Sequence, residues 1–176
     1  MIFDNSKPQF LTLTVVSFVK LFDEEPRRNI IVEALRFSQE NRGLIIHAYV
    51  IMPSHVHMIV RAANGTVLWM ILRDLKKYTS KLIVKSLLQE TTAERRWPLE
   101  VFRGNCKHLK NHKEFKVWKE GYHAIDVSVQ SVFYQKLDYI HRNPVKARLA
   151  ARPEEFEFSS AKNYIGLSTV LEVTST

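Results

Sequence analysis

Two histidines two residues apart, His55 and His57, are the residues of this chain best suited to bind a metal ion. They lie in the apolar, β-branched run IIHAYVIMPSHVHMIV, residues 45–60. Side chains alternate across a β-strand, so both rings face one side, and neutral imidazole is the commonest protein ligand for a divalent metal. The pair therefore predicts a divalent-ion site on a rigid strand. Such a pair is also typical of ordinary semi-buried histidines.

A tyrosine and an asparagine in the later segment KLDYIHRNPVKARLA could serve the same site. Tyr139 and Asn143 are four residues apart, so in a helix they stack on one face. Tyr139 could equally be an amphipathic rim residue, and Asn143 a helix C-terminal residue before proline. Tyr134, just before this segment, is the competing candidate for a nucleophile. Its five-residue offset from Tyr139 turns it about 140° away on a helix.

The pattern of apolar residues predicts the elements that must position these side chains. Before residue 90 it indicates three strands and two helices, at residues 10–16 (strand), 23–41 (helix), 44–52 and 55–61 (strands) and 66–88 (helix). Only Pro53 and Ser54 separate the second strand from the third, and two-residue connections join antiparallel neighbours. The two histidines then begin the second strand of a hairpin.

The pattern weakens after this helix. Residues 89–113 are polar and basic, which favours a long surface connection with a short strand near residues 99–102. Residues 115–127 are typical of a strand pair, or of one strand with a bulge at Gly121. One further strand is enough to complete the sheet.

A last helix is predicted over residues 128–143. Ser128 can cap its start, and Pro144 is expected to enforce its end. The tail beyond it should pack back onto the body through apolar and aromatic side chains, namely Phe156, Phe158 and Tyr164.

This order of elements predicts an α+β fold with the ferredoxin-like β-α-β-β-α-β topology, an antiparallel sheet with helices on one face and an additional C-terminal helix that could supply catalytic groups. The histidines belong to the open face, part of which the last helix must cover. With 176 residues, we expect a single domain over residues 1–176, with a C-terminal extension from about residue 148.

Composition narrows the class of protein. Hydrophobic residues make up 45% and charged residues 25%, as in ordinary globular chains. Cys106 is the single cysteine, which excludes an internal disulfide and a cysteine-based metal cluster and fits a reducing compartment. No signal peptide or membrane-spanning run is visible, so we expect a cytoplasmic protein that does not enter a membrane.

The positive charge is concentrated in one part of the chain. Residues 73–119 hold thirteen basic residues against five acids, a surplus that equals the net charge of +8 for the whole chain. Such a field attracts a polyanion, so nucleic acid is the favoured partner, although a solvated basic face has the same composition. The basic residues that we expect to bind DNA are Arg73, Lys76, Lys77, Lys81, Lys85, Arg95, Arg96 and Arg103.

Two motifs together carry a family resemblance. HAYVIMPSHVHMIV, followed some eighty residues later by YIHRNPVKA, resembles the single-tyrosine transposases of the HUH endonuclease superfamily, and among them the REP-associated tyrosine transposases. The similarity spans roughly residues 10–164 and includes SSAKNY at residues 159–164. The chain departs from the family pattern at Ser54, where Asn is common, and at Arg148, where Gly is common.

The resemblance implies a reaction and a site. His55, His57 and Asn143 are implied to bind a divalent metal, Mg²⁺ or Mn²⁺, and Tyr139 is implied to be the nucleophile. The phenol attacks a phosphodiester of single-stranded DNA, leaving a 5′-phosphotyrosine and a free 3′-hydroxyl, and reversal by a 3′-hydroxyl rejoins strands. A phenol is mostly protonated at neutral pH, so its attack needs help from a divalent ion that polarises the phosphoryl oxygen.

The implied partner is single-stranded or hairpin DNA, at hairpin or palindromic repeat ends, bound by a monomer or a homodimer. Aromatic side chains that could stack on bases are Trp97, Trp118, Phe102 and Tyr122, although we favour core packing for Trp69 and Trp118. Two other functions are compatible with the sequence. One is a nucleic-acid-binding module without catalysis, and the other is a metal-dependent phosphodiesterase that uses water.

Overall fold

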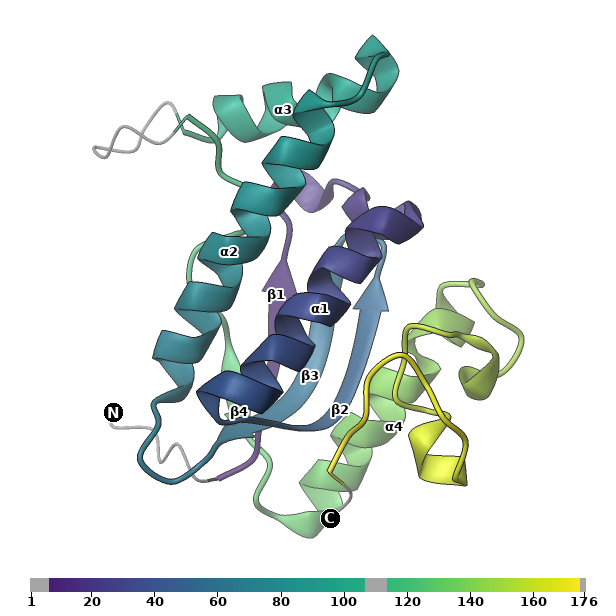
Figure 1. Ribbon diagram of the computed structural model, residues 1–176. Coiled ribbons are helices and arrows are strands. Elements are labelled where there is room, and N and C mark those ends of the chain that lie inside the picture. The colour runs from purple at the N-terminus through teal and green to yellow at the C-terminus, as the bar shows by residue number, and fades with distance from the viewer. Residues whose placement is uncertain (1–6, 107–113, 175–176) are drawn as a thin grey trace.

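The computed structural model, which describes residues 7–106 and 114–174, contains a four-stranded antiparallel sheet between two layers of helices (Figure 1). The strands are β1 (Gln9–Thr14), β2 (Leu44–Met52), β3 (His55–Ala62) and β4 (Ala124–Asp126), in the order β2-β3-β1-β4. The α-helices are α1 (Glu25–Arg42), α2 (Leu68–Leu88), α3 (Ala93–Gly104) and α4 (Gln130–Lys146). The predicted ferredoxin-like α+β class with an additional C-terminal helix is confirmed.

Alternation along β3 divides the molecule into two cores. Val56, Met58 and Val60 face α1 and α2, which cover one side of the sheet and form the larger core with it (Figure 1). Ile59 faces the other side, where it packs with α4 in a second, smaller core. His55 and His57 share the face of Ile59, since the three residues alternate with the first set. The histidines therefore lie on the side of α4, as predicted.

The predicted hairpin is confirmed, because β2 and β3 pair along their length and register Met52 opposite His55. β1 lies on the other side of β3 and registers Thr12 opposite His57. His55 and His57 thus lie on a strand that is paired on both sides, which fixes the backbone under both rings.

The prediction for residues 89–113 was wrong, because α3 occupies most of the described part of this segment. The Thr92 side chain caps it by accepting from the Arg95 amide, and Leu99 and Phe102 bury its inner face. Pro98 lies inside the helix, and together with the density of polar residues it masked the helical spacing of these two apolar residues. No strand forms at residues 99–102.

The predicted end of α4 was also wrong. The helix runs on to Lys146, because Pro144 lies in its last turn. Proline has no backbone N–H, so the helix loses one backbone hydrogen bond there. Beyond it, the Ala147 amide still donates to the Asn143 carbonyl at 3.0 Å, and Arg148 turns the chain with φ 58°. Ser128 does not cap the start, since its hydroxyl donates to Asp126 instead.

The segment before α4 contains less strand than predicted. Only Ala124–Asp126 pairs with β1, and Trp118 adds a single bridge to Val15. Gly121, with φ 62°, turns the chain between these two pairings. β1 itself ends at Thr14 rather than at residue 16.

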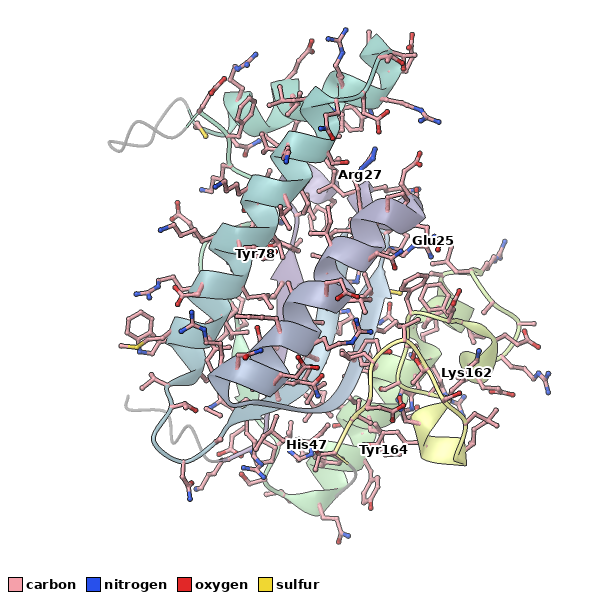
Figure 2. All side chains as sticks on the ribbon, viewed as in Figure 1. Glu25, Arg27, His47, Tyr78, Lys162 and Tyr164 are labelled. Carbon is pink, nitrogen blue, oxygen red and sulfur yellow. The ribbon has the colours of Figure 1, made fainter. Side chains whose placement is uncertain are left out.

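The C-terminal segment lies along the outer edge of β2. The Ile51 amide donates to Phe158 O at 2.9 Å, and the Ser160 amide donates to Tyr49 O at 3.0 Å. Near the opposite end of β2, Tyr164 and His47 lie close together (Figure 2), and the Tyr164 hydroxyl donates to the His47 carbonyl at 2.8 Å. The predicted packing of the tail onto the body is therefore confirmed. Among the described residues, no helix has the length and apolarity that crossing a bilayer needs.

His141 links α4 to this segment and predicts an acid-sensitive contact. Its Nε2 lies 2.9 Å from the Ser160 hydroxyl, its ring packs edge-on against Tyr164, and burial lowers its pKa to about 4. Between pH 6.5 and 4 the unfolded chain binds a proton at this histidine that the folded chain does not. We expect His141 to reduce the free energy of unfolding by about 1.4 kcal/mol per pH unit in this window.

Urea denaturation of the wild type and His141→Gln from pH 7 to pH 4.5 measures this contribution. The variant cannot titrate there, so the stability difference between the two proteins should narrow as the pH falls. A difference that stays constant with pH would contradict the expectation.

Candidate active site

The structure brings His55, His57 and Tyr139 together, although more than eighty residues separate the histidines from the tyrosine. The ring centroids of His55 and His57 are 4.6 Å apart, and those of His57 and Tyr139 are 5.2 Å apart, edge to face. Phe10 of β1 stacks on His57 at 5.6 Å and meets Tyr139 at 5.8 Å. Tyr139 keeps 37% of its surface exposed, beside the buried His57 and the partly buried His55.

A hydroxyl holds one nitrogen of each imidazole. Thr12 Oγ1 lies 2.7 Å from His57 Nδ1, and Ser54 Oγ lies 3.2 Å from His55 Nδ1. In the tautomer whose proton is on Nδ1, each ring donates to its hydroxyl, and Nε2 keeps a lone pair for a metal. Ser54, one of the two departures from the family pattern, therefore has a defined contact with the first motif histidine.

Both imidazoles are held in the neutral form. Burial is the main cause that lowers the pKa of His57 to about 3, and repulsion from His55, when that ring is protonated, and from Lys136 adds to it. Burial also lowers the pKa of His55. A metal binds the neutral ring, so at neutral pH no proton has to leave before these two side chains can act as ligands.

Asn143 lies one helical turn beyond Tyr139 on α4 and is partly buried. Within the described residues, its amide makes no hydrogen bond to either imidazole, and no group of three or more His, Cys, Asp or Glu side chains could hold a metal. A metal at this site would therefore depend on two imidazoles and a neutral amide. These neutral donors suit a divalent ion whose charge is offset by a bound phosphate.

Tyr134, the competing nucleophile, belongs to another part of the surface. It lines a pocket of about 350 Å³ between α4 and the C-terminal segment, together with Asp138, His141 and Tyr164. The edge-to-face contact with His57 belongs to Tyr139 and not to Tyr134, whose ring packs on Phe133.

Two lysines lie beside Tyr139 that the sequence interpretation did not assign to the site. Lys136 Nζ lies 5.7 Å from the centre of the Tyr139 ring and 4.9 Å from that of Phe10. Lys146 Nζ lies 5.7 Å from the Tyr139 ring. Their offsets of −3 and +7 from Tyr139 place all three on one helical face, a spacing that could have identified them.

The eight basic residues predicted to bind DNA lie on α2 and α3, in the helical layer on the other side of the sheet from Tyr139. Some are already engaged: Lys76 donates to the carbonyls of Lys119 and Gly121, Arg73 pairs with Asp74, Arg95 with Glu90 and Arg103 with Glu114. Within the described chain the other four form no ion pair, and they are exposed, namely Lys77, Lys81, Lys85 and Arg96.

The aromatic candidates for base stacking divide in the same way. Trp97 is 49% exposed, whereas Phe102 and Trp118 are buried and Tyr122 is half-buried. The expectation that Trp118 belongs to the core is confirmed. For Trp69 it was wrong, because this side chain is 48% exposed and lies under the Arg73 guanidinium.

Comparison with solved structures shows a protein of the same fold. The structure resembles that of a REP-associated tyrosine transposase bound to a REP hairpin, with a TM-score of 0.65 and 18% identity over 97% of this chain and 87% of the other. It also matches a putative transposase from Deinococcus radiodurans at a TM-score of 0.47 and 15% identity, over 76% of this chain and 88% of the other. No curated protein sequence matches the chain.

The sequence itself matches a family model described as IS200-like transposase. The match covers residues 12–108, more than half of the chain, and includes the end of β1, the hairpin with both histidines, α2 and α3. The chain therefore belongs to the IS200-like transposase family.

Proposed function

We propose that this transposase cleaves and rejoins single-stranded DNA through a covalent link between Tyr139 and a 5′-phosphate. The observation that carries the proposal is the contact of the Tyr139 ring with His57, beside His55. It joins an exposed nucleophile to two neutral metal ligands within one small region of the surface.

The reaction is a phosphoryl transfer between two oxygens. The phenolic oxygen of Tyr139 forms a bond to phosphorus and loses its proton to solvent. The bond between phosphorus and the 3′-oxygen breaks, and that oxygen takes up a proton to become a free 3′-hydroxyl. Attack by a 3′-hydroxyl on the phosphotyrosine reverses the step and rejoins strands, so no nucleotide cofactor is needed.

His55, His57 and Asn143 are the residues that we propose hold a divalent metal, either Mg²⁺ or Mn²⁺. When bound, such an ion would polarise the phosphoryl oxygen and offset charge that develops on it. The neutral state of both imidazoles and the hydroxyl contacts of their Nδ1 atoms support this role. Two nitrogen ligands favour Mn²⁺ over Mg²⁺ in affinity.

We propose hairpin DNA with an unpaired flank as the substrate. A REP-associated tyrosine transposase of the same fold is bound to a REP hairpin. The exposed basic residues of α2 and α3 could hold the paired part of such a hairpin through its phosphates, since they lie on the sheet face away from Tyr139.

Removing the Tyr139 hydroxyl should abolish the covalent product. With single-stranded hairpin DNA and Mn²⁺, the wild type should give a protein–DNA adduct on a denaturing gel. Tyr139→Phe should give none, because no oxygen remains to attack phosphorus.

Tyr134→Phe is the matched control, because Tyr134 is a tyrosine of the same helix and should leave the adduct intact. DNA cleavage that persists in Tyr139→Phe without an adduct would instead indicate a phosphodiesterase that uses water. DNA binding by the wild type without any cleavage would indicate a binding module.

Metal affinity should depend on the Thr12 hydroxyl, which orients the His57 ring. Thr12→Val keeps the shape of the side chain and removes its bond to Nδ1, so the dissociation constant for Mn²⁺ should rise about 10- to 100-fold. Titration calorimetry on the metal-free protein measures the change.

Thr14→Val is the control for this experiment. Thr14 lies opposite His55 in the register of β1 and β3, but its hydroxyl forms no bond to an imidazole within the described residues. Equal Mn²⁺ affinities for Thr12→Val, Thr14→Val and the wild type would contradict an orienting role for Thr12.

A further inference from the structure

One stripe of α4 carries four polar side chains that can act together. Lys136, Tyr139, Asn143 and Lys146 follow one another at spacings of three, four and three residues. At about 100° per residue they fall within roughly 80° of the helix circumference, and they extend over about 15 Å of its length. The two lysines bracket the tyrosine and the asparagine.

The charges of this stripe are uncompensated. Within residues 7–106 and 114–174, neither Lys136 nor Lys146 forms an ion pair with a carboxylate. The acid of α4 nearest to them in sequence, Asp138, pairs with Arg142 at 2.7 Å. The contacts that the lysines do make are with aromatic rings: Lys136 with Phe10 and Tyr139, and Lys146 with Tyr139.

Lys136 is the more informative of the two, because it is partly buried. Its ammonium group lies over the ring of Phe10 and near that of Tyr139, and within the described residues it forms no ion pair with a carboxylate. Lys136 and His57 both lie beside the rings of Phe10 and Tyr139. A lysine that has no ion-pair partner in the described chain, beside two neutral imidazoles, indicates a place for an anion.

We propose that this α4 stripe binds the strand that is cleaved, with Lys136 and Lys146 each contacting a phosphate on one side of the scissile phosphate. The proposal rests on the function proposed for Tyr139, since it places the reacting phosphate between the two lysines. It assigns the cleaved strand to the α4 side of the sheet, and leaves the basic residues of α2 and α3 to DNA on the other side.

The test measures binding apart from cleavage. In a Tyr139→Phe background, Lys136→Gln and Lys146→Gln are compared by fluorescence anisotropy with a labelled oligothymidylate, which forms no hairpin, over a range of salt concentrations. Each substitution should lower the slope of log K against log salt by about 0.7 and weaken binding about fivefold at 0.1 M salt. Lys136→Arg and Lys146→Arg should restore most of the affinity.

Lys162→Gln is the matched control, because it removes one positive charge from the C-terminal segment and not from α4 (Figure 2). Its salt slope should equal that of the Tyr139→Phe parent. Substitutions at Lys136 and Lys146 that leave affinity and slope at the control value would overturn the proposal. So would a loss of affinity that the arginine variants do not restore, which would indicate a packing role.

Failure of this proposal can be distinguished from failure of the proposed function. The anisotropy experiment does not depend on the adduct, so the α4 stripe could bind single strands even if Tyr139 formed no covalent link. Conversely, adduct formation in wild type with no change of affinity in the lysine variants would support the role of Tyr139 and overturn that of the lysines.

Discussion

The packing of α4 on the sheet face opposite α1 and α2 is the contact on which the candidate site depends. Phe133, Leu137 and Ile140 form its buried stripe and meet Val50 and Ile59 of the hairpin in the smaller core. Full burial of one such aliphatic side chain contributes roughly 1.5–3 kcal/mol, so a few of them fix the helix. Without this contact, nothing would hold the phenol beside imidazoles that are distant in sequence.

The same contact sets the chemistry of the site. The Tyr139 ring of α4 packs on the buried His57, and burial is the main reason that His57 and the partly buried His55 stay neutral. No carboxylate joins them in a metal-binding group within the described residues. An acidic site would repel DNA, whereas two neutral imidazoles near lysines would not.

Much of this could be predicted from the sequence, because the signals were local. The hairpin follows from two apolar runs separated by two residues, and the shared face of Tyr139 and Asn143 follows from helical spacing. The convergence of hairpin and last helix is not local. It was expected from the uncovered sheet face and from two family motifs in the right order, and the ring contacts now give it a geometry.

The errors arose where tertiary context outweighed local pattern. Pro98, in the middle of α3, and Pro144, in the last turn of α4, both lie inside helices, and both are buried there. Local pattern does not show that packing can hold a proline in a helix. The sequence shows the surplus of basic residues in 73–119, but it does not show on which side of the sheet they lie. Helical spacing alone does not reveal which face of a sheet a helix covers. Lys136 and Lys146 were passed over because two lysines in one helix are unremarkable until the phenol between them is seen.

The C-terminal segment explains how a single helix can be held on an otherwise open face. It bonds along the edge of β2 through Phe158 and Ser160, and it reaches α4 through the contact of Ser160 with His141. Ser160 thus contacts both the edge of β2 and α4. Its hydroxyl also contacts the backbone of Tyr49. An exposed edge strand would invite pairing with another chain, and here the protein's own tail occupies it. The orientation of Tyr139 therefore depends on residues after α4 as well as on the sheet beneath it.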